Sequence, residues 1–254
     1  MRFRLLGPVE VIDVAGRWQP VAGPRQRALL ATLLLNSNTP ISVDELAETV
    51  WDGVPPAGYA QTLRSHVMRL RRSLQAQDAV LLRTRAPGYE LAVADCELDA
   101  RRFEALCRET AEQLRVGAWS AVADTAERAL NLWRARPLLD VPSRLLSEAV
   151  VPRLEQLRLQ VLDFRFDAEL HLGRHHVLVP QLQALVAVHP LHERFSAQLM
   201  LSLSRAGRRV EALAVYRSAR RTLIDELGVE PGPEMARVHQ CILSGGDPVV
   251  DHAA

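Results

Sequence analysis

The sequence predicts a mainly α-helical protein that begins with a smaller α+β portion. Residues 1–93 mix short alternating apolar stretches with helical patterns, whereas residues 99–243 are almost wholly helical in pattern. Hydrophobic residues make up 48% of the chain and aromatic residues only 5%, so the core must be built from Leu, Val and Ala, which favours helices. We therefore expect an N-terminal domain over 1–94, a helical domain over 95–244 and a disordered tail over 245–254.

The α+β portion is expected to begin with short strands. Residues 2–5 and 9–11 alternate with a period of two, and residues 18–21 form a third candidate strand. Gly7-Pro8 and Ala15-Gly16 mark the turns between them.

Two helices follow these strands. Pro24 suits the first position of a helix that continues through the apolar run 28–35, and Asn36 can end it. The second helix begins with a capping box, in which Ser42 is the N-cap and Glu45 is the third helical residue.

A third helix is expected over about residues 58–75. Leu63, Val67, Leu70 and Leu74 recur at spacings of 4, 3 and 4 residues, so they share one buried stripe. The opposite face is polar and basic, and it carries Gln61, Arg64, Ser65, Met68, Arg69 and Arg72.

Residues 81–93 predict a β-hairpin after this helix. Pro87 and Gly88 fit the two central positions of a type II turn, in which glycine takes the positive φ. Arg83 and Arg85 are two residues apart, so they project from one face near the tip.

Positive charge is concentrated on the third helix and the hairpin. The chain has a formal net charge of +1, but residues 60–85 hold six arginines and one aspartate, which gives this segment a charge of +5. An arginine-rich helix face is often only solvated. Here it lies opposite an apolar stripe, follows a short capped helix and precedes a second basic patch. These features indicate a winged helix-turn-helix that contacts a polyanion.

The major groove of B-DNA admits one α-helix, so the third helix is the expected reading element. Arg64 and Arg69 can each donate two hydrogen bonds to guanine, and Met68 can contact a thymine methyl group. Arginines on the hairpin suit the DNA backbone or an adjacent minor groove. The predicted DNA-binding set is Gln61, Thr62, Arg64, Ser65, Met68, Arg69, Arg71, Arg72, Arg83, Thr84 and Arg85.

The remaining chain predicts a series of helices over about 99–116, 118–135, 145–172, 176–188, 191–206, 208–227 and 233–243. Gly173 and Gly207 are 34 residues apart and each precedes an apolar helix, which is the spacing of tetratricopeptide repeats. Stacked helix pairs of this kind form concave surfaces that bind proteins.

Several classes of protein are excluded by what the sequence lacks. No run approaches the roughly 18 apolar residues of a membrane span, and the three cysteines form no CxxC pair, so we expect a cytoplasmic protein. A metal site at His171, His175 and His176 is not expected, because Gly173 interrupts the helix between them. Neither GxSxG nor HExxH occurs, so we expect no enzyme and no cofactor.

The sequence also resembles a known family along nearly its whole length. The segments FRLLGPVEV (3–11), GPRQRALL (23–30), TLRSHVMRLRR (62–72) and PGY (87–89) are similar to those of the Streptomyces antibiotic regulatory proteins. The segments ELDARRF (97–103), ALAVYR (212–217) and DELGVEPGP (225–233) resemble the bacterial transcriptional activation domain of that family.

This resemblance implies an OmpR-type winged helix followed by a tetratricopeptide-like domain. It also implies an activator of secondary-metabolite genes that binds promoter direct repeats as a side-by-side homodimer and recruits RNA polymerase holoenzyme, including its sigma factor. In the OmpR-type pattern the loop after the second helix can contact polymerase; here it includes Asp52, Gly53, Val54 and Pro55. No GxxxxGK[ST] run is present, so the chain resembles the short members of the family and is expected to need no ATP.

One alternative comes from a different class of function. The chain could be a helical-repeat adaptor whose N-terminal domain docks on a protein and not on DNA. Dependence of binding on salt distinguishes the two, because contacts to DNA phosphates weaken steeply as salt rises.

Overall fold

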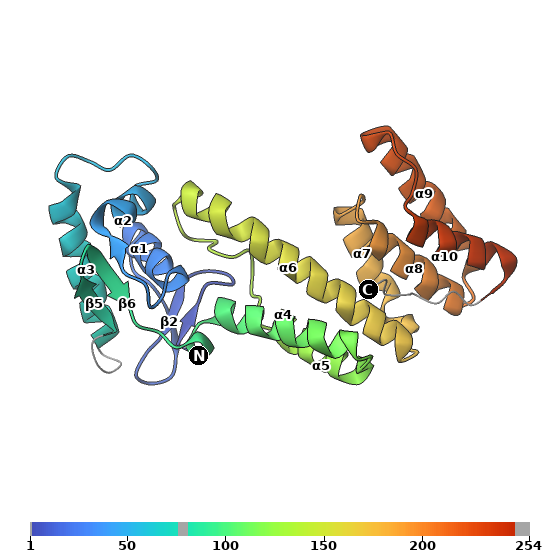
Figure 1. The fold of residues 1–254 in the computed structure, drawn as a ribbon, viewed down its shortest axis with the longest axis horizontal. Coiled ribbons are helices and arrows are strands. Elements are labelled where there is room, and N and C mark those ends of the chain that lie inside the picture. The colour runs from blue at the N-terminus through green and yellow to red at the C-terminus, as the bar shows by residue number, and fades with distance from the viewer. Residues whose placement is uncertain (1, 76–80, 247–254) are drawn as a thin grey trace. The chain divides into compact units, whose positions relative to one another are not determined.

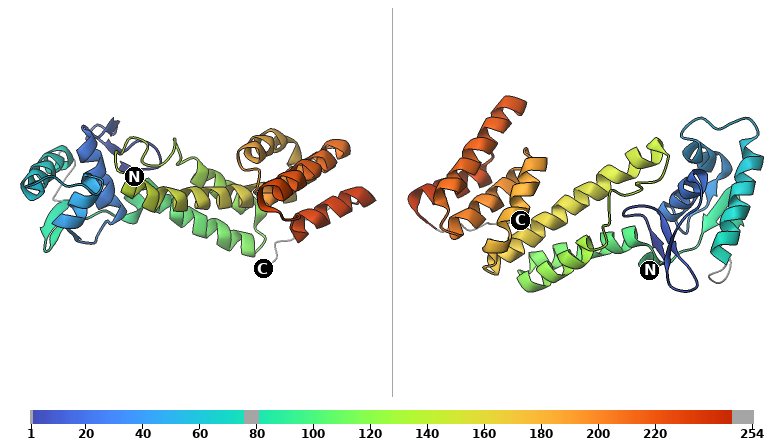
Figure 2. Two further views of the ribbon diagram at one scale, coloured as in Figure 1. Left: turned by 90° about the horizontal axis from the view of Figure 1, so that it is seen from above. Right: turned by 180° about the vertical axis from the view of Figure 1, so that it is seen from behind.

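A computed structural model describes residues 2–75 and 81–246. The chain forms two compact units, one of residues 1–108 and 128–159 and the other of residues 109–127 and 160–254. The N-terminal strands and first three helices belong to the first unit, and the last four helices belong to the second (Figures 1 and 2). Among the described residues, no helix has both the length and the apolar character that crossing a membrane requires.

The α+β portion has the expected order of strands, three helices and a hairpin. Its first sheet is antiparallel with the order β1-β2-β3, and its second is antiparallel with the order β4-β6-β5. The elements are β1 (Phe3–Arg4), β2 (Glu10–Ile12), β3 (Trp18–Pro20), α1 (Pro24–Leu35), β4 (Ile41–Ser42), α2 (Val43–Val50), α3 (Tyr59–Gln75), β5 (Leu82–Arg85) and β6 (Gly88–Leu91).

Local sequence explains why the three helices form here. The backbone N–H of Glu45 donates to Ser42 Oγ at 3.2 Å, and the N–H of Ser42 donates to Glu45 Oε2 at 3.0 Å, so the predicted capping box is confirmed. The three leucines and the valine of the α3 stripe are at most 3% exposed, and they pack in one core with the buried faces of α1 and α2.

The predicted type II turn of the hairpin is wrong. The Ala86–Pro87 peptide bond is cis, and Gly88 is the first residue of β6, paired with Arg85, without a positive φ. Close packing explains the glycine, because a Cβ atom at Gly88 would lie 2.1 Å from the carbonyl oxygen of Ile41 on β4. The turn places Pro87 at its third position.

The rest of the chain is helical, as expected. Its elements are two short 3-10 helices, η1 (Asp95–Glu97) and η2 (His175–Val177), and seven α-helices: α4 (Asp99–Arg115), α5 (Trp119–Leu130), α6 (Arg144–His171), α7 (Val179–Val188), α8 (Glu193–Arg205), α9 (Arg209–Leu227) and α10 (Pro233–Ser244).

Two of the expected helices have different bounds. The helix expected over 118–135 ends at Leu130, because the following segment pairs with the N-terminus: Arg134 N donates to Leu6 O, and Leu138 N donates to Leu5 O. The helix expected over 176–188 is split into η2 and α7. Pro180 lies in the first turn of α7. Its ring would clash with a preceding helical turn, so η2 and α7 do not form one continuous helix.

The N-terminal segment is also held by Asp99, the first residue of α4. Its carboxylate accepts from Leu5 N at 2.7 Å and from Leu6 N at 3.0 Å, and the side chain is 1% exposed. Burial raises the pKa of Asp99 to about 6, although the two N–H donors and Arg134 act in the opposite direction. Asp140 adds a similar contact by accepting from Val9 N at 2.8 Å. The core of the first unit therefore uses residues beyond position 94.

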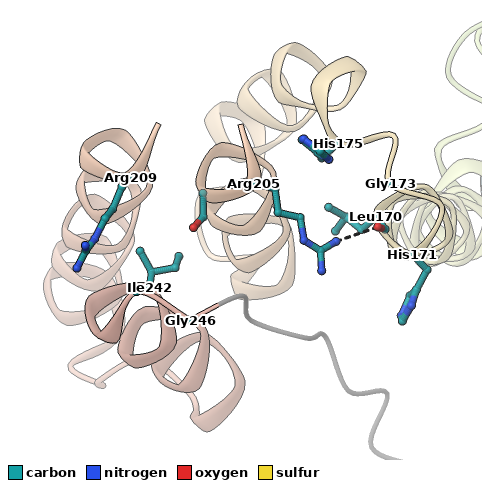
Figure 3. Close-up of a pocket in the computed structure, with 10 residues that line it drawn as sticks. Leu170, His171, Gly173, His175, Arg205, Arg209, Ile242 and Gly246 are labelled. Atoms are coloured by element: carbon teal, nitrogen blue, oxygen red, sulfur yellow. Dashed lines mark hydrogen bonds between the residues drawn. The ribbon is translucent and has the colours of Figure 1, made fainter. Parts of the chain in front are cut away.

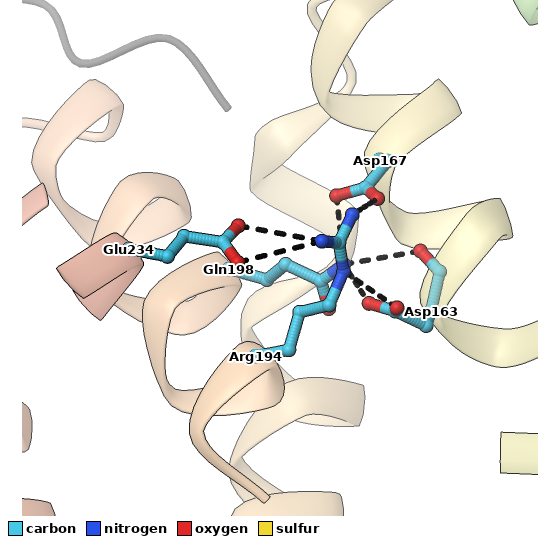
Figure 4. Close-up of polar contacts among 5 residues, drawn as sticks. All are labelled: Asp163, Asp167, Arg194, Gln198 and Glu234. Atoms are coloured by element: carbon cyan, nitrogen blue, oxygen red, sulfur yellow. Dashed lines mark hydrogen bonds and ion pairs between the residues drawn. The ribbon is translucent and has the colours of Figure 1, made fainter. Parts of the chain in front are cut away.

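The second unit is organised around α8, whose residues from Phe195 to Leu203 are all buried. A polar cluster joins this helix to its neighbours α6 and α10 (Figure 4). Arg194 forms ion pairs with Asp163 at 2.5 Å, with Asp167, and with Glu234 at 3.4 Å. The tail expected over 245–254 lies mostly outside the described residues, which end at Gly246.

Candidate nucleic-acid interface

The outer face of α3 is exposed as its spacing predicts. Leu63, Val67 and Leu70 face the core with no more than 1% exposure. Met68, on the opposite side, is 53% exposed. The other predicted base- and phosphate-contacting residues of this helix are also exposed: Gln61, Thr62, Arg64, Ser65, Arg69 and Arg72. The helix contains no acidic residue, so the exposed face is uniformly neutral or positive.

Contacts from α1 and α2 fix the position of α3. Tyr59 donates to Asp44 Oδ1 at 2.6 Å at the beginning of the helix. Two turns further, Gln26 Nε2 lies 3.2 Å from His66 Nδ1, and the His66 ring meets Trp51 edge-on with 6.0 Å between centroids. Burial, with Arg69 and Arg25 nearby, lowers the pKa of His66. A lowered pKa favours the neutral imidazole, and His66 serves as a packing residue of α3.

The three exposed arginines of α3 differ from several other arginines of the first unit. Arg2, Arg4 and Arg27 form ion pairs with Glu97, Glu10 and Asp140 at 3.3–3.6 Å. Within the described part of the chain, no ion pair involves the three exposed arginines of the helix face, Arg64, Arg69 and Arg72. Three guanidinium groups on one exposed face thus keep their charge and their donors for an external anion.

The hairpin β5–β6 forms the wing. Leu82 is buried, and the alternation of β5 turns Arg83 and Arg85 to the opposite, exposed face as expected. Arg85 is 58% exposed and lies 3.8 Å from Glu90, which neutralises part of its charge. Thr84 is exposed and points toward α3, where its Oγ1 accepts a hydrogen bond from Arg71 at 2.8 Å.

Arg71 has a different position from the other predicted DNA-binding arginines. It is half-buried, and its Nε donates to the carbonyl oxygen of Leu82 at 3.0 Å while Nη2 donates to Thr84. Its guanidinium also lies over the ring of Tyr89, 5.8 Å from the centroid. Arg71 therefore joins the wing to α3, and sequence reasoning could not separate it from the exposed arginines beside it.

The loop between α2 and α3 is anchored at one end. Asp52 has a φ of 52° and accepts a hydrogen bond from Leu145 N, in the first turn of α6, at 2.9 Å. Gly53 follows with a φ of 83°. Beyond these residues the loop is open: Val54 is 79% exposed and Pro55 is exposed. The loop thus presents a small apolar surface at a fixed position.

Sequence reasoning missed the residues that position α3. Gln26 and Asp44 have no local signal, because their partners on α3 lie 40 and 15 residues away. In the described ranges, no group of three or more His, Cys, Asp or Glu residues is arranged to hold an ion. His171 is stacked on Trp119, with 3.8 Å between ring centroids.

Comparisons with known proteins agree with this arrangement. The family described as the C-terminal part of transcriptional regulatory proteins matches residues 20–91, which include α3 and the wing. The bacterial transcriptional activator domain matches residues 98–243, more than half of the chain.

The chain is similar to regulators along almost all of its length. It is 34% identical to the regulatory protein DnrI of Streptomyces peucetius, over 99% of this chain and 94% of DnrI. It is 38% identical to the regulatory protein AfsR of Streptomyces coelicolor, over 98% of this chain but only 25% of AfsR. The solved structure of Mycobacterium tuberculosis EmbR in complex with a low-affinity phosphopeptide superimposes with a TM-score of 0.90 at 31% identity, covering 98% of this chain and 66% of EmbR.

An exposed arginine-rich helix and a wing, joined to an activator domain, define a DNA-binding transcriptional regulator of the activator type. The matches to the activator domain and to DnrI identify the family. This chain belongs to the Streptomyces antibiotic regulatory proteins.

Proposed function

We propose that the protein activates a secondary-metabolite gene cluster, such as one for an antibiotic. It binds direct repeats in promoter DNA as a side-by-side homodimer and recruits RNA polymerase holoenzyme. The observation that carries DNA binding is the exposed α3 face with three arginines for which the described structure holds no ion-pair partner. Its membership of a family of antibiotic regulators supports the kind of gene controlled.

Base recognition is assigned to the middle of α3. Arg64 and Arg69 donate to guanine edges in the major groove, and Met68 contacts a thymine methyl. Gln61, Thr62 and Ser65 contact base edges or phosphates, and Arg72 holds phosphate. On the wing, Arg83 and Arg85 contact the DNA backbone or the adjacent minor groove. Arg71 and Thr84 act on DNA chiefly by holding the wing beside α3.

Polymerase recruitment is assigned to the loop after α2. Val54 and Pro55 form its exposed apolar part, whereas Asp52 is engaged with the first turn of α6 and Gly53 provides the bend. This anchoring holds the loop at a defined position relative to the base-reading helix, because both elements belong to the same compact unit.

Replacing Arg64 by alanine should weaken binding to the best duplex by about 1–3 kcal/mol, because one bidentate contact to a guanine is lost. Binding to a duplex of random sequence should weaken less. Replacing Arg85 on the wing should weaken binding to both duplexes to the same degree, since phosphate contacts do not depend on sequence. Fluorescence anisotropy at fixed salt measures both affinities.

Arg102→Ala is the matched control, because it removes one exposed positive charge from α4, outside the proposed interface. Its affinity for either duplex should stay close to that of the parent protein. If Arg64→Ala and Arg85→Ala have the same effect on both duplexes, the assignment of base reading to α3 is wrong. The adaptor alternative predicts in addition that binding changes little with salt, whereas each phosphate contact contributes a slope of about −0.9 to log K against log salt.

A further inference from the structure

The first turn of α6 is held by a residue of the loop between α2 and α3. Leu145 is the second residue of α6, so its backbone N–H has no acceptor within the helix. Asp52 Oδ1 accepts this N–H at 2.9 Å, and the N–H of Leu146 donates to Ser143 Oγ at 3.3 Å. The negative charge of Asp52 also suits the positive end of the helix dipole. Asp52 thus caps a helix whose first turn is 93 residues away along the chain.

The backbone around Asp52 is adapted to this contact. Its φ of 52° lies in the left-handed region, which aspartate tolerates better than most residues. Gly53 continues the turn with a φ of 83°, and its N–H donates to Glu48 O at 2.8 Å at the end of α2. The direction in which the loop leaves α2 is therefore fixed by the turn and by the capping contact together.

Leu145 also adds an apolar side chain beside this loop. A Cβ atom at Gly53 would lie 3.7 Å from Leu145 Cδ1, so the leucine packs against the glycine. Leu145 is nevertheless 39% exposed, and Val54 and Pro55, which follow Gly53, are exposed as well. These three apolar residues form what we call the loop–α6 surface. Two of them come from the loop and one comes from α6.

The charged groups beside the loop–α6 surface have partners of their own. Arg144, next to Leu145, forms an ion pair with Glu148 at 3.7 Å, and Asp52 is engaged with the N-terminus of α6. The centres of protein–protein interfaces are depleted in charged residues. The loop–α6 surface therefore fits an apolar protein surface, whereas the arginine face of α3 fits DNA.

We propose that Leu145 belongs to the surface that contacts RNA polymerase holoenzyme, and that Asp52 is the positioning residue that holds this surface together. The inference rests on the proposed recruitment of polymerase by the loop after α2. It extends the contact into the activator domain, because Leu145 lies within the residues that match that domain. The loop and Leu145 belong to the same compact unit.

Transcription in vitro tests this contact. The template carries the best-bound duplex upstream of a weak promoter, and Streptomyces RNA polymerase holoenzyme transcribes it. Leu145→Ala and Val54→Ala should each lower the transcript yield about fivefold or more, because both truncate a central apolar contact. Both variants should keep the DNA affinity of the parent protein. Val188→Ala is the matched control, since Val188 at the end of α7 is 71% exposed and lies in the second unit; its yield should not change.

Two variants of Asp52 test the positioning role. Asp52→Gly removes the carboxylate at a backbone position that glycine accepts, whereas Asp52→Asn keeps an oxygen acceptor. Asp52→Gly should lower the transcript yield and reduce the protection of the Leu145 N–H from hydrogen exchange about tenfold or more. Asp52→Asn should restore most of both. Exchange at the other end of α6, where Arg205 Nη1 donates to Leu170 O at 2.8 Å, should stay the same (Figure 3).

The outcomes separate this inference from the proposed function. If Val54→Ala lowers the yield and Leu145→Ala does not, the extension to α6 is wrong and the role of the loop stands. If neither variant lowers the yield, the loop does not recruit polymerase and the inference fails with it. A loss of DNA affinity in Leu145→Ala that accounts for its lower yield would also overturn the inference. Equal yields from Asp52→Gly and Asp52→Asn would contradict the positioning role of Asp52.

Discussion

Replacing Arg194 by methionine should destabilise the second unit by about 3–5 kcal/mol, because two buried carboxylates lose their counterion. Asp167 is fully buried and the side chain of Asp163 is 10% exposed, and both form ion pairs with Arg194. Gln198 Nε2 donates to both carboxylates, at 2.6 and 2.8 Å, but an amide carries no charge that could replace the guanidinium (Figure 4). Amide hydrogen exchange of α8 measures this loss locally.

The deficit of this variant should depend on pH. Burial and the charge of Asp167 raise the pKa of Asp163 from 3.8 to about 7, in spite of Arg194. The native state thus binds this proton more tightly than the unfolded chain, so the stability contributed by the group decreases as pH rises from about 4 to about 7. Removing Arg194 raises the pKa of Asp163 further. The deficit should therefore be largest near pH 8 and smaller near pH 5, where protonation removes the unpaired charge.

Arg220→Met is the control for this experiment, because Arg220 forms an exposed ion pair with Glu230 at 2.5 Å. Exposed ion pairs contribute little to stability, so the rate of amide hydrogen exchange in the second unit should hardly change. A deficit of Arg194→Met that matches this control would show that the buried ion pairs do not stabilise the unit. A deficit that does not vary between the two pH values would contradict the titration assigned to Asp163.

Replacing Asp99 by alanine should destabilise the first unit by several kcal/mol. The N–H groups of Leu5 and Leu6 are buried and would lose their acceptor, and each unsatisfied group costs about 1–3 kcal/mol. Asp99→Asn should cost less, since its amide oxygen can still accept. Hydrogen exchange of residues 3–6 reports the opening of this segment directly.

The exposed Asp95, four residues earlier, is the matched control. Asp95→Ala should leave exchange of the N-terminal segment unchanged. Equal protection in Asp95→Ala and Asp99→Ala would contradict the role given to the Asp99 carboxylate. A fragment that ends at Ala94 lacks Asp99 and Asp140, which hold the segment after β1.

Much of the fold could be predicted from local sequence. The spacing of Leu63, Val67 and Leu70 determined which side of α3 is buried, and the Ser42–Glu45 capping box determined where α2 begins. These signals are local, because helix periodicity and capping depend on residues within one or two turns. For the same reason the exposed arginine face could be located from the sequence alone.

Contacts between distant segments could not be predicted in this way. The end of α5 at Leu130 depends on hydrogen bonds to Leu5 and Leu6, about 130 residues away. The turn at Gly88 depends on the backbone of Ile41, and the role of Arg71 depends on Thr84. A single sequence shows that these residues are small or basic but not which partners they meet.

Selection of bound duplexes from a randomised DNA pool by the purified full chain tests whether α3 reads promoter DNA. We expect enrichment, at near-physiological salt, of a short motif in direct repeat with the copies about one helical turn apart. Arg64→Ala should lose preference at defined positions of that motif, and Arg102→Ala should keep it. Recovery of no motif by the parent protein, or of the same motif by Arg64→Ala, would contradict the assignment of α3 as the helix that reads promoter DNA.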